Sequence, residues 1–253
     1  MSKILVIAKN TFREAIRDRI LYAILGFALL FIISTIFLAS ISLGEDLKII
    51  RDFGLAGIYL FGTLIAIFLG TWLIYKEIEK QTVYVVLSKP ISTFEFILGK
   101  FLGLFTAVAL CIFLMATVYL SLVAVKGGGF DSLGLLAIIF QLLEIMIFIS
   151  LTIMFSSFAR PFAAMIYSVL ILYIGHSLTL LVKFALKNGG IFKYITVIIY
   201  YLLPNLEKFN IRNLVIHNQS VSLLQFFAAL AYAVFYSAIL LFLANSALKR
   251  QEF

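Results

Sequence analysis

Six long apolar blocks dominate the sequence, and each is about as long as a helix that crosses a lipid bilayer. They cover residues 20–43, 53–75, 101–125, 132–159, 161–182 and 221–248. About 20 consecutive apolar residues suffice to span the hydrocarbon core. The blocks lack strand-like alternation, so helices must satisfy the backbone in lipid. The sequence therefore predicts an all-α polytopic membrane protein with six transmembrane helices, forming a single transmembrane domain over residues 1–253.

The composition agrees with residence in a membrane. Apolar residues make up 64% of the chain and charged residues only 13%, against roughly one quarter in a soluble domain. A further apolar stretch, residues 194–203, is too short to span a bilayer. We expect it to form a short interfacial or re-entrant helix within an external segment over residues 183–220.

The basic residues predict the orientation. Five Lys or Arg residues precede the first apolar block, and two follow it before the second. Because cytoplasmic loops carry the excess of Lys and Arg, both termini are predicted in the cytoplasm, in a multi-pass protein of the cell membrane. The net charge of +8 gathers at membrane edges, where topology and anionic lipid explain it. Nucleic-acid binding is therefore rejected.

Residues 1–19 have a helical pattern of their own. One helical face carries apolar residues, among them Ile4, Ala8, Phe12 and Ile16. The opposite face carries polar or charged residues, among them Lys9, Arg13 and Arg17. This pattern indicates an amphipathic helix that lies in the cytoplasmic interface. The alternative is a solvated basic arm that only sets the orientation.

Small residues recur at every fourth position in the second predicted span, and again from just before the third predicted span into it. The positions are Gly62, Ala66 and Gly70 in the second span, and Gly99, Gly103 and Ala107 leading into and along the third. Small residues at this spacing let helix backbones approach closely in lipid. The pattern predicts tight helix packing, either within one bundle or between two subunits.

Few polar side chains fall inside the predicted spans. Glu144 is the only acidic residue there, and Gln141 lies on the same helical face, three positions earlier. His176 is a lone imidazole in the fifth span. An acid inside a membrane is costly and suggests a functional site. A protonated Glu144 that bonds to Gln141 or to a neighbouring helix would instead be structural.

Motifs of catalysis are missing from the sequence. It contains no P-loop, HExxH, CxxC or nucleophile elbow, and only two His and one Cys. We therefore expect a chain that is not an enzyme and that binds no metal or cofactor itself.

The segment over residues 76–100 has a mixed character. Charged residues at 76–80 extend the second span, an apolar run follows, and Pro90 breaks the helix. Thr93 is predicted to cap a new helix that enters the third span. A short segment held between two spans is a suitable contact for a cytoplasmic partner.

At these residues the chain resembles the permease subunits of type-2 ABC transporters, the ABC-2 family. That family has a Glu after the second span, then a Thr or Gly, a Leu-Ser-x-Pro-Ile/Val-Ser motif and a Gly-Lys pair that enters the third span. The matching residues are Glu77 or Glu79, Thr82, Leu87, Ser88, Pro90, Ile91, Ser92, Gly99 and Lys100. The likeness extends to the number of spans, a Pro-Asn-Leu-Glu sequence at residues 204–207 and a basic tail.

The resemblance implies an exporter: a dimer of permease subunits, identical or different, on two cytoplasmic ATP-binding subunits that hold ATP and Mg²⁺. Residues 76–100 would carry the coupling helix between spans 2 and 3. The residues that would contact the ATP-binding subunit are Glu77, Glu79, Thr82, Pro90, Ile91, Ser92 and Glu95, with Arg13 and Arg17 from the N-terminal helix.

Two other functions fit the same topology. One is an ion-coupled secondary transporter that uses Glu144, although the spans show no inverted repeat. The other is a membrane assembly factor that transports nothing.

Overall fold

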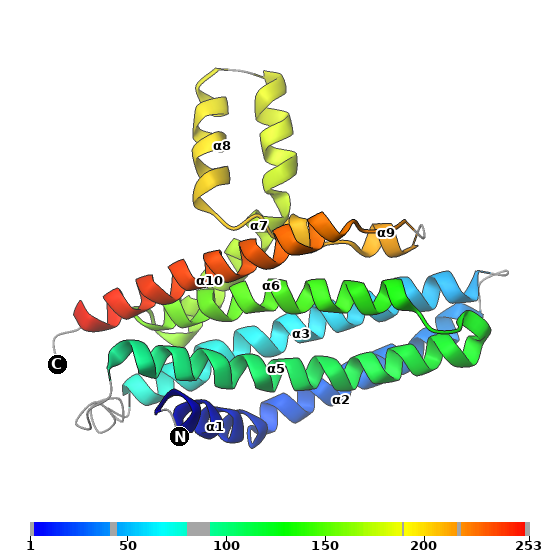
Figure 1. Cartoon of the computed structure of the whole chain (residues 1–253), viewed down its shortest axis with the longest axis horizontal. Helices are drawn as coiled ribbons and strands as arrows, with labels where there is room; N and C mark the ends of the chain where they lie inside the picture. Colours follow the sequence, from blue (N-terminus) through cyan, green and yellow to red (C-terminus); the bar gives the residue numbers. More distant parts are fainter. Residues whose placement is uncertain (1–2, 41–44, 80–91, 189, 217–218, 251–253) are drawn as a thin grey trace.

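The computed structural model describes residues 3–40, 45–79, 92–188, 190–216 and 219–250, which form a helical bundle (Figure 1). Its elements in chain order are α1 Lys3–Ile16, α2 Arg19–Ser40, α3 Asp46–Glu79, α5 Thr93–Val123, the π-helical turn η1 Ala124–Gly128, α6 Ser132–Ser156, α7 Pro161–Asn188, α8 Gly190–Leu202, the 3₁₀ turn η2 Leu206–Phe209, α9 Arg212–Ile216 and α10 Leu223–Arg250.

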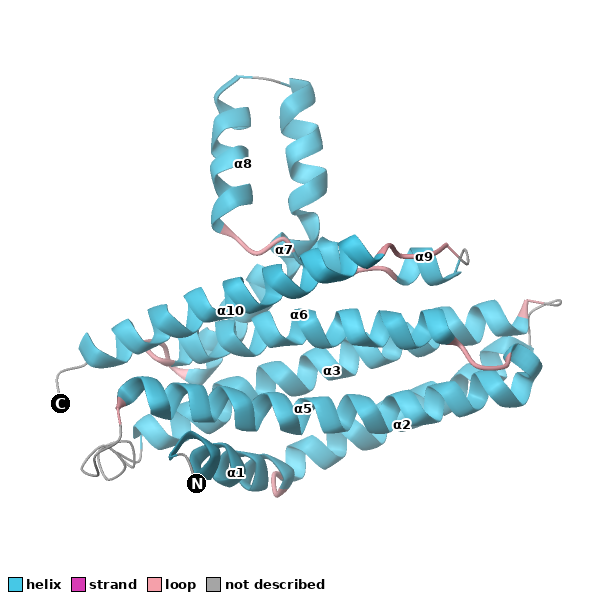
Figure 2. Ribbon diagram, viewed as in Figure 1, coloured by secondary structure: helices cyan, strands magenta, loops and turns pink. Residues whose placement is uncertain are grey.

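The predicted all-helical fold is confirmed. Within the described ranges every regular element is a helix (Figure 2). Six of these helices, α2, α3, α5, α6, α7 and α10, are long and apolar enough to cross a membrane. Two of them extend well beyond the apolar blocks, because α3 begins at Asp46 and α5 at Thr93. Two charged side chains at the start of α3 pair with residues near the start of α6: Asp46 with Lys126 and Arg51 with Asp131.

Helix α6 lies at the centre of the bundle. It packs against α3, α5, α7 and α10, and α2, α3, α5, α6 and α10 run roughly side by side along the long axis (Figure 1). In the most apolar 18-residue stretch of α6, 78% of the residues are buried, against 17% in the corresponding stretch of α7. Most apolar side chains of α7 therefore face away from the rest of the chain.

Helix α8 forms a hairpin with the second half of α7. The two helices lie side by side and project from the bundle (Figure 1). Helix α8 includes residues 194–202 of the short apolar stretch predicted at residues 194–203. The hairpin carries exposed apolar side chains that include Leu180, Phe184, Ile198 and Tyr201. Such a surface is suited to lipid or to another protein, and not to water.

Helix α1 packs directly on α5. A Cβ atom placed on Gly99 would lie 2.7 Å from Cβ of Ile7, and one on Gly103 would lie 2.6 Å from the carbonyl oxygen of Ala8. These glycines therefore allow α1 to lie against the backbone of α5. One partner of this small-residue stripe is thus a helix of the same chain.

We predict that Gly103→Leu separates α1 from α5. The added side chain has no room at this contact, and overpacking typically costs about 1–3 kcal/mol. The midpoint of thermal unfolding in detergent, followed by circular dichroism, should fall. Gly26→Leu is the matched control, because a Cβ there meets nothing within 4 Å. Equal midpoints for the two variants would contradict this packing.

Candidate functional site

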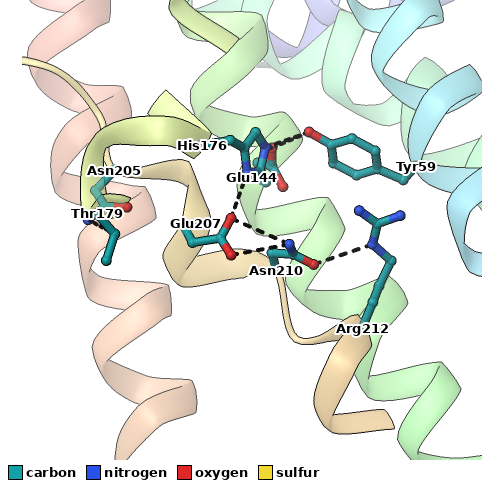
Figure 3. Close-up of polar contacts among 8 residues, drawn as sticks. All are labelled: Tyr59, Glu144, His176, Thr179, Asn205, Glu207, Asn210 and Arg212. Atoms are coloured by element: carbon teal, nitrogen blue, oxygen red, sulfur yellow. Dashed lines mark hydrogen bonds and ion pairs between the residues drawn. The ribbon is translucent and has the colours of Figure 1, made fainter. Parts of the chain in front are cut away.

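A polar cluster occupies the middle of the bundle, where α3, α6 and α7 meet. Glu144 of α6 has a side chain that is only 4% exposed. The hydroxyl of Tyr59, from α3, donates to Oε1 of Glu144 at 3.0 Å, and Nε2 of His176, from α7, lies 2.9 Å from the same oxygen. The Tyr59 hydroxyl also lies 2.6 Å from Nε2 of His176. Figure 3 shows the three side chains pointing toward one another.

The cluster continues into the chain between α8 and α10, which we call the return segment (residues 203–216). Oε2 of Glu207 lies 3.2 Å from Nδ1 of His176. Nδ2 of Asn210 lies 3.4 Å from both oxygens of Glu207, and Nε of Arg212 donates to Oδ1 of Asn210 at 3.3 Å (Figure 3). The Arg212 guanidinium then lies over the Tyr59 ring, 4.9 Å from its centroid. The contacts thus form a closed ring.

Apolar side chains hold the return segment against the bundle. Leu206, Phe209 and Ile211 are all buried. Gly175, the residue before His176, makes room for them, because a Cβ there would lie 2.8 Å from the carbonyl oxygen of Pro204 and 2.9 Å from Leu206. The segment therefore lies close enough to α7 for Glu207 to reach His176.

Gln141 makes a separate contact between α6 and α3. Its Nε2 donates to the carbonyl oxygen of Ile58 at 2.9 Å. A Cβ on Gly62 would lie 2.9 Å from this nitrogen, and a Cβ on Gly70 would clash with the side chain of Thr152. Two of the small residues of α3 thus face α6, and Ala66 between them is fully buried. Ala107 of α5 is buried as well.

The ring of contacts offers both a mechanical link and a path for protons. Four side chains follow one another at hydrogen-bonding distance, in the order Tyr59, Glu144, His176 and Glu207. The Glu207 side chain at the end of this series is 40% exposed. Glu207 also lines a hollow of about 430 Å³ beside α6 and α10. The three side chains from the spans, Tyr59, Glu144 and His176, each have a partner in the chain, which lowers the free-energy cost of placing them in an apolar setting.

A second charged cluster, which the sequence analysis missed, closes the end of the bundle near η1. Oδ2 of Asp131 accepts from Nε of Arg51 at 3.1 Å and from the Tyr119 hydroxyl at 2.6 Å. Oδ1 of Asp131 accepts from the backbone N–H of Gly134 at 3.2 Å and caps α6. The available signal was the Asp that directly precedes the fourth apolar block, a typical N-cap residue.

At the opposite end, Glu14 joins α1 to two other helices. Its Oε1 lies 3.4 Å from Nζ of Lys76 at the end of α3, and its Oε2 lies 3.9 Å from Nζ of Lys100 in α5. The side chain of Lys100 is only 2% exposed. Arg13 and Arg17 are exposed at this end. The N-terminal helix is thus linked to α3 and α5 by charge as well as by packing.

Only part of the predicted contact segment lies in the described residues. Glu77 and Glu79 belong to the last turns of α3, although their side chains are not described. Thr82, Pro90 and Ile91 lie outside the described residues.

The start of α5 differs from the prediction. Thr93 was predicted as the cap, which is wrong by one residue. Ser92 is the cap, because its Oγ accepts from the Glu95 backbone N–H at 3.2 Å, and Glu95 Oε2 accepts from the Ser92 backbone N–H at 2.9 Å. This reciprocal pair satisfies two backbone donors, so it determines where the helix begins.

Comparison with protein families identifies the class of this chain. Residues 5–253 match the family described as ABC-2 family transporter protein. The chain therefore belongs to this family, which confirms the resemblance to type-2 ABC permeases. With its six apolar helices it is a multi-pass membrane component of a transporter. A comparison with curated proteins finds no match.

We predict that Glu207→Gln loosens the return segment. The change keeps the shape of the side chain and removes its charge, and a hydrogen bond to a charged group contributes about 1.5–3 kcal/mol. Amide hydrogen exchange over residues 203–216 should become roughly tenfold faster or more. Glu45→Gln is the control, because Glu45 forms an exposed pair with Lys48 outside the cluster. Unchanged exchange in the Glu207 variant would show that the ring does not hold this segment.

Proposed function

We propose that this chain is the membrane-spanning subunit of an ATP-driven exporter, coupled to a separate ATP-binding subunit that holds ATP and Mg²⁺. The observation that carries the proposal is the family match over residues 5–253. The sequence contains no Walker motif, so ATP must be bound by a partner. The subunit would reside in the cell membrane with both termini in the cytoplasm.

The charged end formed by α1, α3 and α5 is the surface that we assign to the ATP-binding subunit. The contact residues would be Glu77, Glu79, Thr82, Pro90, Ile91, Ser92 and Glu95, with Arg13 and Arg17 as weaker candidates. Helices α3 and α5 continue without a break from this end into the membrane. Residues 59 and 79 of α3 are separated by about 30 Å of helix, so a push at Glu79 would reach the polar cluster at Tyr59.

The second permease subunit, of the same or another kind, would cover α7 and the α7–α8 hairpin. Helix α7 has the smallest buried share among the six apolar helices of the described residues. Its exposed apolar side chains include Ile166, Val169, Leu170 and Tyr173. Lipid would cover the apolar faces that remain.

The polar cluster has a structural role in this proposal. Glu144 has two partners from α3 and α7, and the contacts close on themselves through Arg212 and Tyr59. Such a ring would hold the return segment while the helices move together. The alternative, ion-coupled transport through Glu144, would let the isolated chain work under an ion gradient. A membrane assembly factor would transport nothing in either setting.

The purified chain alone should hydrolyse no ATP, because the energy source is a separate protein. Extraction from native membranes in mild detergent should co-purify an ATP-binding subunit together with ATP hydrolysis. The measurement is phosphate release by the purified chain and by the co-purified complex. Sustained hydrolysis by the chain alone, after removal of every other protein, would contradict the assignment.

Reversing the charges at the end of α3, in the double variant Glu77→Lys and Glu79→Lys, should weaken the contact with the ATP-binding subunit. Truncating a charge pair at an interface typically costs about 2–5 kcal/mol, so retained ATP hydrolysis should fall at least about tenfold. Yield in the membrane fraction should not change. The control, Glu45→Lys, places one reversed charge beyond the opposite end of α3. Equal retention by both variants would place the contact elsewhere.

A further inference from the structure

Two hollows meet where α1 turns into α2, at the charged end of the bundle. The first is polar, has a volume of about 770 Å³ and is lined by charged side chains that include Arg13, Glu14, Arg17, Asp18, Arg19 and Lys76. The second is an apolar groove of about 160 Å³ between α2, α3 and the start of α7. Asp18 lines both, so the groove opens at the polar hollow.

The polar hollow carries basic side chains that are available to an anion. Its two acids are engaged within the chain: Glu14 pairs with Lys76 and Lys100, and Oδ1 of Asp18 accepts from the backbone N–H of Ile20 at 2.9 Å. The three arginines, Arg13, Arg17 and Arg19, are exposed. None of them forms an ion pair with a residue that the structure describes. The hollow is therefore complementary to a negatively charged group.

The groove extends from this hollow into the span. Along α3, Lys76 and Leu73 line the hollow, and Trp72, Leu69, Phe68 and Ile65 line the groove. The seven positions from Trp72 to Ile65 correspond to about 10 Å of helix. One leaflet of the hydrocarbon core is about 15 Å thick. The groove thus reaches part of the way across one leaflet, and Trp72 lies near its mouth, at the membrane interface where Trp is enriched in membrane proteins.

We propose that the hollow and the groove together bind one anionic phospholipid. Its phosphate contacts Arg13, Arg17 and Arg19, and one acyl chain lies in the groove against Leu69 and Trp72. A free phosphate would leave the groove empty, and a water-soluble protein could not follow it to the depth of Ile65. A lipid supplies the charge and the apolar chain in the order in which the site presents them. Arg13 and Arg17, the weaker candidates for contact with the ATP-binding subunit, would then bind the lipid instead, and the other contact residues of that subunit are unaffected.

The chain reports on this site directly, because Trp72 is its only tryptophan. The purified protein is reconstituted in phosphatidylcholine vesicles that contain a set fraction of lipid with brominated acyl chains. Bromine quenches tryptophan fluorescence only at close range. Brominated phosphatidylglycerol should quench Trp72 at lower mole fraction than brominated phosphatidylcholine, with about tenfold tighter relative binding.

The triple variant Arg13→Gln, Arg17→Gln and Arg19→Gln should remove this preference. The matched control is Lys183→Gln, Lys187→Gln and Lys193→Gln, which removes three charges from the α7–α8 hairpin and should keep it. The two lipids are compared on the unchanged protein first, so the proposal can be tested even if the arginine variant inserts poorly.

Two results would overturn the proposal. One is equal quenching by the two lipids in the unchanged protein. The other is a preference that the arginine variant retains. If the lipids quench equally while the arginine variant loses its co-purifying ATP hydrolysis, the arginines contact the partner protein, and the lipid site is wrong.

Discussion

Hydrocarbon offers no hydrogen-bond partner, so a charged or strongly polar side chain within these spans is costly unless the protein supplies a partner. The ring around Glu144 meets this requirement with groups from three helices and the return segment. Two glycines make related contacts possible: Gly175 lets the return segment approach α7, and Gly62 gives Gln141 room to reach α3. The same contacts determine where α3, α6 and α7 lie relative to one another.

The two ends of the bundle are stabilised in different ways. Near η1, Asp131 caps α6 and pairs with Arg51. At the other end, Glu14 joins α1 to α3 and α5 beside a close contact at Gly99 and Gly103. Continuous helices connect these ends. In a member of the ABC-2 family, this arrangement would let a movement applied at the charged end reach the centre of the membrane.

The sequence predicted the helices well, because six apolar blocks leave few alternatives in lipid. It also indicated Glu144, Gln141 and His176 as unusual. It could not indicate their partners, since Tyr59 and His176 are 117 positions apart and only the packing of α3 against α7 brings them together. The small residues Gly99 and Gly103 predicted a close approach of two helices, but they did not identify the second helix. The structure shows that it is α1 of the same chain.

The proposed function requires the charged end of the bundle to lie in the cytoplasm, within reach of an ATP-driven partner. Its most direct test is the labelling of single cysteines by a maleimide that cannot cross membranes, after the buried native Cys111 is replaced by Ala. Asn10→Cys in α1 should react only in inverted vesicles, and Gln219→Cys before α10 should react in intact cells. Labelling of position 10 from outside intact cells would contradict the account.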